Sequence, residues 1–334
     1  MVSTPTRLHF AYRHVDRPWG GANNFIRALH ASLESCGQFE FTGDIGEDCD
    51  ILFMNELGMG PANGSRQWPL RAIRRLMRHR PRRLVVRAVN LNRHAFRMGI
   101  RNRIVGRFKD RKTLALLDMA DHVIFQSHYQ RDVFRDAGYH GGRNTVIHNG
   151  ADPFFWNNSP TPPSSPLRIV STTASARETK RHDLIAQLSL IPGIEVHHAG
   201  LWPAGLNSAN VTRHGLLTRE QIAALFATSH CLFHPAVKDP CPNSIFEALV
   251  GGLPVIYNPG PGSSAEIVGE CGLPLAEQDL GSTVEMLRER LGALCEKVLE
   301  TRSAYLASHS ADRYRSVFEQ VMLQSPKHSL GRGS

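Results

Sequence analysis

Two acidic residues in the C-terminal half of the chain, Asp239 and Glu247, are separated by seven residues that carry no charge. A carboxylate accepts hydrogen bonds from two hydroxyl groups at once, so both acids suit a ligand with neighbouring hydroxyls. Each also has an alternative without a ligand. Ser244 and Glu247 have the spacing of a helix capping box, and Asp239 precedes Pro240, where an aspartate suits a loop turn. Sugar binding therefore remains open for both acids, with helix capping as the alternative for Glu247 and a loop turn as the alternative for Asp239.

Two glycine-rich segments can bring backbone N–H groups close to an anion. One is Pro-Trp-Gly-Gly at residues 18–21 and the other is Asn258–Ser264, and each precedes a predicted helix. Glycine permits a close approach of the backbone, and the N-terminus of a helix favours negative charge. The candidate anion-binding residues are Gly20, Gly21, Gly262, Ser263 and Ser264. The alternatives are a tight turn at the first segment and a capping box from Ser263 to Glu266 at the second.

Positive charge is concentrated in Ser171–Arg181, which overlaps a predicted strand and the loop after it. The segment contains Arg177, Lys180 and Arg181. Cations aimed at developing negative charge contribute several kcal/mol in an enclosed site, and the loss of one typically costs about 2.7–4 kcal/mol. The segment is therefore a candidate for binding an anionic group, with a basic surface loop as the alternative.

The motifs of the C-terminal half resemble family 4 (group 1) glycosyltransferases of the GT-B fold. That family carries Glu-x7-Glu, followed by Glu-Ala-x-x-x-Gly-x-Pro-Val. Here Asp239-x7-Glu247 is present, and residues 247–255 read Glu-Ala-Leu-Val-Gly-Gly-Leu-Pro-Val. The resemblance implies that Asp239 contacts the transferred sugar and that Glu247 holds the ribose hydroxyls of a nucleotide. Asp239 departs from the pattern, because aspartate is one methylene shorter than glutamate.

Further segments match the same family. Lys180 stands where the family has its phosphate-binding lysine, with Arg181 in place of the usual glycine. The resemblance implies that Lys180 and Arg177 neutralise the nucleotide diphosphate as it leaves. The segment from Asn258 to Val268 is similar to the family's glycine-rich loop, with Ser263 in place of a glycine, and Val146–Asp152 resembles its Val-Ile-x-Asn-Gly-x-Asp.

Many family members carry a histidine near the transferred sugar, at the end of the strand that corresponds to Leu84–Val89. In this chain Arg87, Asn90 and His94 occupy that neighbourhood. Asn90 is taken as the candidate catalytic residue, and the three alternatives remain open.

Short apolar runs alternate with helical patterns, which predicts parallel sheets covered by helices on both faces. Parallel sheets bind ligands beyond the carboxyl ends of their strands, so we expect the loops after strands to line a cleft between two facing sheets. The expected strands are Leu8–Tyr12, Asp50–Met54, Leu84–Val89, His122–Phe125, Asn144–Ile147, Arg168–Thr172, Ile194–Ala199, Cys231–His234 and Pro254–Tyr257. The expected helices are Ala22–Ser35, Trp68–His79, Lys109–Ala120, His128–Ala137, Asp183–Leu190, Thr218–Thr228, Ser244–Val250, Thr283–Ala307 and Asp312–Leu323.

The resemblance and this alternation imply an α/β protein of the GT-B class with two Rossmann-like domains. Residues 1–156 would form the acceptor-binding domain, and residues 167–307 the nucleotide-sugar-binding domain. Residues 157–166 contain four prolines and predict a semi-rigid linker. Residues 308–324 are expected to cross back to the first domain, and residues 325–334 to fray.

Charge is distributed unevenly along the 334 residues. Residues 66–112 contain 17 Lys and Arg against one acid, a net charge of +16 that leaves −7 for the rest of a chain of net charge +9. Such a segment attracts anions, including an anionic membrane surface. Leu70, Ile73, Leu76 and Met77 form an apolar stripe in its first helix, and we expect this stripe to be core.

Composition narrows the classes further. A hydrophobic content of 41% and a charged content of 21% exclude a disordered, collagen-like or coiled-coil chain. No segment reaches the roughly 18–20 apolar residues that span a bilayer, and residues 1–17 do not resemble a secretory signal. The six cysteines contain no Cys-x-x-Cys pair and suit reduced thiols. We therefore expect a cytoplasmic protein, peripheral at the inner face of the membrane.

The resemblance implies a retaining glycosyltransferase that moves a sugar from a nucleotide-diphosphate sugar to a glycan or lipid-linked acceptor. The pathway it implies is polysaccharide or lipopolysaccharide biosynthesis. The resemblance implies no metal or other cofactor, because Lys180, Arg177 and helix N-termini carry the diphosphate. One alternative is a weakened GT-B protein that binds a nucleotide sugar or serves as a partner subunit, given the substitutions at positions 239 and 263. The other is a nucleic-acid-binding protein, which leaves the paired acids unexplained.

Overall fold

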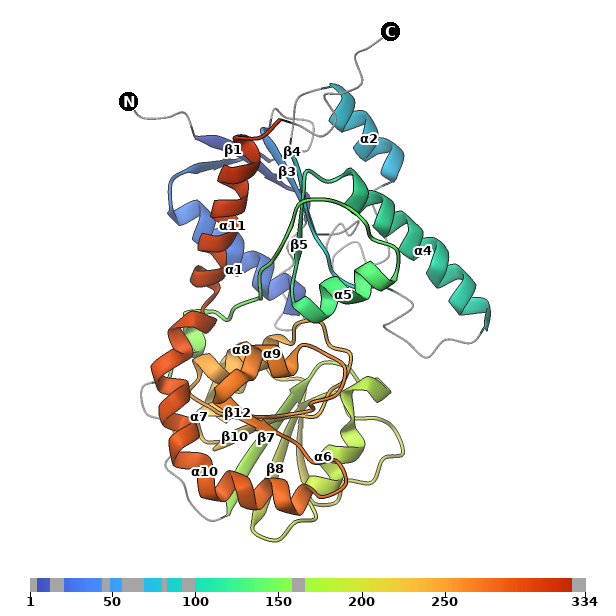
Figure 1. The fold of residues 1–334 in the computed structure, drawn as a ribbon. Helices are drawn as coiled ribbons and strands as arrows, with labels where there is room; N and C mark the ends of the chain where they lie inside the picture. Colours follow the sequence, from blue (N-terminus) through green and yellow to red (C-terminus); the bar gives the residue numbers. More distant parts are fainter. Residues whose placement is uncertain are drawn as a thin grey trace. The chain divides into compact units, whose positions relative to one another are not determined.

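The computed structural model describes residues 5–12, 21–43, 49–55, 69–79, 83–91, 100–157 and 166–325. The chain divides into two compact units (Figure 1). The first consists mainly of Ile26–His148 and includes the chain from Ser310 onward, and the second consists mainly of Asn149–His309. Each unit contains one six-stranded sheet, and the strand pairings described are all parallel.

The sheet of the first unit has the strand order β2-β1-β3-β4-β5-β6. Its strands are β1 (Thr6–Phe10), β2 (Phe39–Phe41), β3 (Ile51–Asn55), β4 (Arg83–Arg87), β5 (His122–Phe125) and β6 (Asn144–Val146). The helices are α1 (Gly21–Ser35), α2 (Leu70–His79), α4 (Ile100–Met119), α5 (His128–Asp136) and α11 (Ala307–Met322). All five residues of β3 are buried, as in a parallel sheet that is covered on both faces.

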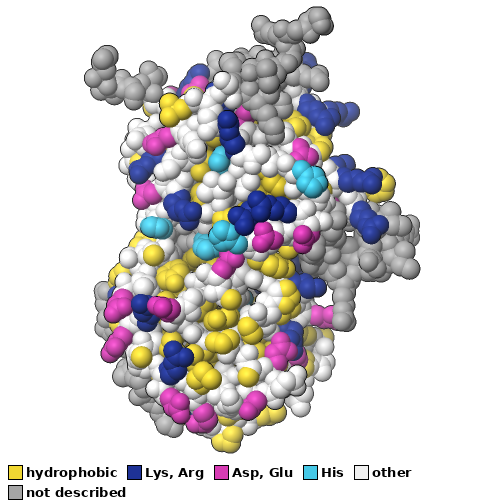
Figure 2. Space-filling model, in the orientation of Figure 1, with side chains coloured by type: hydrophobic (Ala, Val, Ile, Leu, Met, Phe, Trp, Pro, Cys, Tyr) yellow, Lys and Arg dark blue, Asp and Glu magenta, His cyan; other side chains and the backbone are white. Residues whose placement is uncertain are grey.

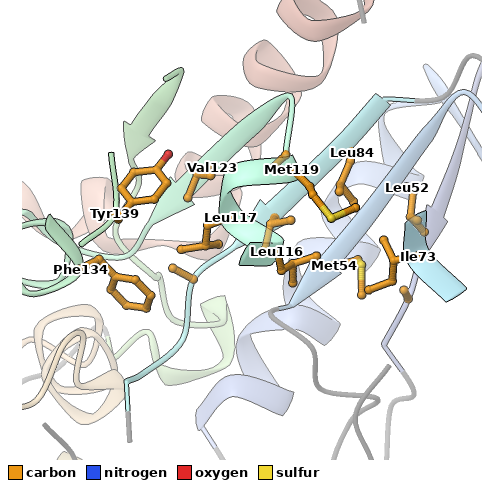
Figure 3. Close-up of a cluster of buried hydrophobic side chains, with 14 of the residues drawn as sticks. Leu52, Met54, Ile73, Leu84, Leu116, Leu117, Met119, Val123, Phe134 and Tyr139 are labelled. Atoms are coloured by element: carbon orange, nitrogen blue, oxygen red, sulfur yellow. The ribbon is translucent and has the colours of Figure 1, made fainter. Parts of the chain in front are cut away.

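Successive side chains of β3 point to opposite faces of this sheet. On one face, Leu52 and Met54 join a core that includes Ile73 of α2 and Leu116 of α4 (Figure 3). On the other face, the ring of Phe53 meets Tyr314 and Phe318 of α11, with centroids 5.9 and 5.7 Å apart. The last helix of the chain therefore completes the core of the first unit. The apolar stripe of α2 also packs in the core as predicted, with Ile73 and Met77 buried.

The sheet of the second unit has the strand order β12-β11-β10-β7-β8-β9. Its strands are β7 (Leu167–Thr173), β8 (Ile194–Gly200), β9 (Val211–Gly215), β10 (Cys231–His234), β11 (Val255–Tyr257) and β12 (Gly272–Pro274). The helices are α6 (His182–Leu188), α7 (Arg219–Ala227), α8 (Asn243–Val250), α9 (Ser264–Val268) and α10 (Leu280–Thr301). One core includes residues of α7, α8 and α9, and a second includes residues of α6 and α10.

This strand order places a topological switch point between β7 and β10. From β7 the chain proceeds to β8 and β9 in one direction, and from β10 to β11 and β12 in the other. Connections that diverge in this way leave a crevice at the carboxyl ends of the two strands, which is where open parallel sheets bind their ligands. The loops after β7 and β10 are therefore the first place to look for a site.

Most predicted elements are present, and the differences have local causes. The strands β2, β9 and β12 were not predicted; each lies at or beside a sheet edge, and the last four residues of β9 are exposed, so no apolar pattern marks it. Helix α4 begins at Ile100 rather than Lys109; four of its first ten residues are Arg or Lys, and a glycine at position 106 interrupts the helical pattern. Helix α10 ends at Thr301, before the 3-10 turn Arg302–Tyr305. Among the described residues, no helix is long and apolar enough to cross a membrane.

Candidate functional site

The loops after β7 and β10 are joined by their backbones at the switch point. After β7 the chain forms the 3-10 turn η3 (Glu178–Lys180), and the N–H of Val237, in the loop after β10, donates to the carbonyl oxygen of Thr179 at 2.9 Å. The neighbouring residues Lys180 and Asp239 are thereby brought together from segments that are distant in the sequence.

Lys180 and Asp239 form an ion pair, with 2.7 Å between Nζ and Oδ2. Their side chains are only 22% and 16% exposed. The second carboxylate oxygen of Asp239 accepts from the N–H of Cys241 at 3.3 Å. Burial alone raises the pKa of Asp239, but the Lys180 ammonium and the hydrogen bonds outweigh it and hold this pKa below its ordinary value. The predicted sugar-binding acid and the predicted phosphate-binding cation are therefore direct partners.

The glycine-rich loop after β11 lies against the same acid. Gly262 has a φ of 152°, and a Cβ there would lie 3.4 Å from the N of Lys238. Ser263 donates from its N–H and from its Oγ to the carbonyl oxygen of Asp239, at 3.0 and 3.2 Å. Ser263 makes no side-chain cap at α9, so the alternative of a capping box with Glu266 is not formed. Ser263 instead joins this loop to the loop after β10.

Ser264 follows as the first residue of α9, a helix of five residues. Its hydroxyl is buried and has no hydrogen-bond partner among the described residues. A buried hydroxyl without a partner is uncommon, and its position next to Ser263 places it beside the loop that touches Asp239.

Glu247 lies on α8, the helix that follows Asp239. The cap of this helix is Pro242 rather than Ser244, so the predicted capping box is not formed and helix capping does not explain the acid. Within the described part of the chain, nothing donates a hydrogen bond to its carboxylate. Burial raises the pKa of Glu247 to about 7, although the Arg219 guanidinium acts in the opposite direction. The half-buried carboxylate is thus available to a ligand that brings its own donors.

A histidine that the sequence motifs did not single out lies beside the ion pair. His234 ends β10, and its Nδ1 lies 3.4 Å from Oγ of Ser244. Its Nε2 is buried without a hydrogen-bond partner in the described residues. Burial lowers the pKa of His234 to about 4, and the Lys180 ammonium acts in the same direction. The imidazole is therefore neutral at physiological pH.

Arg181 and Arg177 differ in their surroundings. Arg181 has a φ of 51°, a conformation that explains why a glycine suits this position. Its guanidinium binds Asp183 at 2.9 Å and Glu277 at 2.9 Å. Arg177 stands at the N-cap position of η3, and its exposed side chain makes no capping hydrogen bond there. Its backbone N–H donates to Oγ of Ser175 at 3.4 Å.

Glu277 completes a set of contacts among three loops. Its Oε1 also accepts from Nδ2 of Asn258 at 2.8 Å, and the same amide nitrogen donates to the carbonyl oxygen of Pro235 at 3.2 Å. Asn258 opens the glycine-rich loop, so this contact orients that loop. Sequence reasoning missed Glu277 because it lies in an unremarkable loop after a short edge strand.

The candidates in the first unit are described separately. Gly20 lies outside the described residues, and Gly21 is the first residue of α1. Asn90 is exposed beyond the end of β4. Arg87 is buried at the end of β4, where its guanidinium donates to Asn55 at 2.7 Å and to Gln126 at 2.5 Å, so it is part of the interior. His94 also lies outside the described residues.

The fold is GT-B, α/β with two parallel sheets, and the predicted fold class is confirmed. Sucrose-phosphate synthase from Thermosynechococcus elongatus is similar, with a TM-score of 0.71 and 14% identity, covering 95% of this chain and 99% of that one. HepE of Anabaena, solved with UDP-glucose, has a TM-score of 0.67 and 16% identity, covering 94% and 99% of the two chains. WaaG, a glycosyltransferase involved in lipopolysaccharide biosynthesis, has a TM-score of 0.63 and 15% identity, covering 93% and 99%. No family model and no curated protein matches the sequence.

Proposed function

We propose that the chain is a glycosyltransferase that moves a sugar from a nucleotide-diphosphate sugar to an acceptor and retains the configuration at the anomeric carbon. The observation that carries the proposal is the Lys180–Asp239 pair at the switch point of the second sheet, with 2.7 Å between Nζ and Oδ2. A cation suited to a diphosphate and an acid suited to sugar hydroxyls meet where such sheets bind ligands.

Each part of the donor has a candidate partner. The unpaired carboxylate of Glu247 suits the two ribose hydroxyls, because a carboxylate accepts from both. Lys180 and Arg177 suit the diphosphate, whose charge grows as its bond to the anomeric carbon breaks. The N–H of Gly262 and the hydroxyl of Ser264, which has no partner among the described residues, can donate to phosphate oxygens. Ser263 supports this loop, because both of its donors are held by the carbonyl oxygen of Asp239. We also propose Gly20 and Gly21 as further phosphate contacts and Asn90 as a contact of the sugar.

The donor is proposed to bind without a metal ion, because Lys180 and Arg177 supply positive charge at the diphosphate. The UDP-glucose complex of HepE, which has the same fold, supports a uridine nucleotide as the first donor to test. In the described residues, no group of three or more His, Cys, Asp or Glu side chains is placed to hold a metal.

The acceptor is proposed to be a glycan or a lipid-linked glycan of cell-surface polysaccharide or lipopolysaccharide biosynthesis, bound by the first unit. Exposed side chains of α4 support a peripheral location at the inner face of the membrane. Arg107, Lys109, Arg111 and Lys112 are exposed on its second half, and Phe108 is 59% exposed among them. Figure 2 shows Lys and Arg side chains on the described surface in the region of this helix. Basic residues around an exposed aromatic ring suit an anionic membrane surface.

The proposal is tested by release of nucleoside diphosphate from UDP-, GDP-, ADP- and dTDP-sugars in EDTA. We expect slow hydrolysis of the donors of one nucleotide, and loss of this activity in Lys180→Ala. Glu285→Gln, which changes an exposed acid on α10, serves as the matched control. Binding of a nucleotide sugar without any turnover would favour the alternative of a partner subunit.

A further inference from the structure

The ion pair between Lys180 and Asp239 occupies both groups before any donor binds. Nζ of Lys180 has no partner other than Asp239 among the described residues, and Oδ2 of Asp239 receives its short contact from that ammonium. The other oxygen has only the longer contact of 3.3 Å with the N–H of Cys241. The cation that suits a diphosphate is therefore held by the acid that suits a sugar.

The backbone fixes both partners independently of the ion pair. The N–H of Val237 donates to the carbonyl oxygen of Thr179, one residue before Lys180. Ser263 holds the carbonyl oxygen of Asp239 with two donors. When the flexible lysine side chain turns toward another anion, the backbone that carries Asp239 therefore keeps its hydrogen bonds.

We propose that donor binding exchanges the partners of this pair, and that Asp239 thereby discriminates the intact nucleotide sugar from the free nucleoside diphosphate. The ammonium of Lys180 turns to the diphosphate, and hydroxyls of the sugar replace it at Asp239. A nucleoside diphosphate without a sugar takes the ammonium and leaves Oδ2 of the little-exposed carboxylate without a donor, next to negatively charged phosphates. The inference rests on the proposed function and adds that the product is bound less tightly because of Asp239.

This exchange gives Asp239 an effect on a ligand that it does not touch. Like charges brought together in a partly buried site repel strongly, so the carboxylate weakens the binding of the product. An acid that only contacts the sugar would leave the affinity for the free diphosphate unchanged. An acid that only positions Lys180 would strengthen that affinity. The three roles therefore predict opposite or zero changes in the affinity for the free nucleoside diphosphate when the charge of Asp239 is removed.

The experiment measures Kd for UDP and for UDP-glucose by calorimetry in EDTA, or for the corresponding pair of whichever nucleotide binds the wild-type chain. We expect Asp239→Asn to bind UDP on the order of tenfold more tightly, the effect of removing one like charge near the phosphates, and to bind UDP-glucose more weakly. Asp239→Ser, measured beside it, also removes the charge and keeps an acceptor for the N–H of Cys241. Asp239→Glu keeps the charge, and Glu285→Gln removes a distant one.

The outcomes separate the two proposals. If UDP affinity is unchanged or falls in both neutral variants, the partner exchange is overturned while the proposed function stands. If Glu285→Gln tightens UDP binding as much as Asp239→Asn does, the effect is one of overall charge and the exchange is overturned as well. If the wild-type chain binds no nucleoside diphosphate and no nucleotide sugar, the proposed function falls, and the exchange falls with it.

Discussion

Arg181 donates from Nη1 to Oε1 of Glu277 at 2.9 Å, and this contact joins the loop after β7 to the loop after β12. Between these two loops lie those that carry Asp239 and Gly262. Hydrogen bonds from Asn258 and from Arg181 hold the pKa of Glu277 below its ordinary value, so the acid stays charged over the physiological range. Arg181 thus connects two of the loops around the candidate site.

Two substitutions of Arg181 should distinguish what its backbone conformation and its side-chain contacts each contribute to stability. Arg181→Ala and Arg181→Gly lose the same contacts with Asp183 and Glu277, but only glycine is unstrained at a φ of 51°. We expect Arg181→Gly to be more stable than Arg181→Ala by roughly 0.5–1 kcal/mol. Urea denaturation of the two variants measures this difference, and equal midpoints would show that the left-handed conformation carries no strain.

Glu247 should make nucleotide affinity depend on pH near neutrality. Burial raises its pKa from 4.5 to about 7, and the ribose hydroxyls donate to the ionised form. Affinity should therefore rise between about pH 6 and pH 8 in the wild-type chain. In Glu247→Gln this rise should be smaller, and the remaining slope reports the titration of the nucleotide itself. Identical slopes in the two proteins would exclude Glu247 from the nucleotide site.

The same pKa shift predicts how folding stability varies with pH. The folded state favours the protonated form of Glu247. Its ionisation therefore destabilises the wild-type fold: this effect is absent below pH 4.5, the pKa in the unfolded chain, and is complete once the pH has passed about 7. We expect the stability of Glu247→Gln, relative to wild type, to increase from pH 5 to about pH 8. A constant difference across this range, measured by denaturation, would contradict the buried environment of the carboxylate.

A side chain at Gly262 should strain the backbone. Its φ is 152°, a conformation that residues other than glycine rarely adopt, whereas the backbone N atoms of Lys238 and Asp239 would lie at ordinary contact distances of 3.4 and 3.5 Å from a Cβ. We expect Gly262→Ala to cost about 1–2 kcal/mol of stability and to weaken nucleotide binding. Gly292, on α10, is the matched control, because a Cβ there has nothing within 4 Å. Gly292→Ala should leave binding unchanged and raise stability by about 1 kcal/mol at most; weakened binding there would point to an indirect effect.

The outer surface of α4 should bind anionic vesicles. Arg107, Phe108, Lys109, Arg111 and Lys112 are all exposed, whereas Asp110 is buried. In flotation at low salt, the wild-type chain should rise with vesicles that contain anionic lipid and not with neutral ones. Arg111→Glu combined with Lys112→Glu should abolish this. Arg290→Glu on α10 is the control, and equal flotation of all the variants would remove α4 from the proposed membrane surface.

The alternation of apolar runs and helical patterns was sufficient to predict the α/β class, because central strands such as β5 and β10 are continuous buried runs. The same criterion could not find β9, whose last four residues are exposed. It also shortened α4, where Gly106 interrupts the helical pattern. Edge strands are stabilised by neighbours that a local pattern does not contain.

The candidate site was predictable in its residue types but not in its contacts. The spacing of Asp239 and Glu247 was visible, yet the capping alternative for Glu247 could be settled only by the position of the helix cap at Pro242. The pairing of Lys180 with Asp239 joins residues 59 positions apart, and no local pattern reports it. Glu277 and His234 were not found, because the contacts that place them join segments that are distant in the sequence.

The central claim is that the second unit binds a nucleotide-diphosphate sugar at Lys180. It is tested most directly by thermal unfolding with UDP-, GDP-, ADP- and dTDP-sugars in EDTA, on wild type and Lys180→Ala. A ligand at about 100 times its Kd stabilises the folded state by about 2.7 kcal/mol, which shifts the unfolding temperature measurably. We predict stabilisation of the wild-type chain by the sugars of one nucleotide and its loss in Lys180→Ala. No stabilisation by any of them, or equal stabilisation of both proteins, would contradict the account.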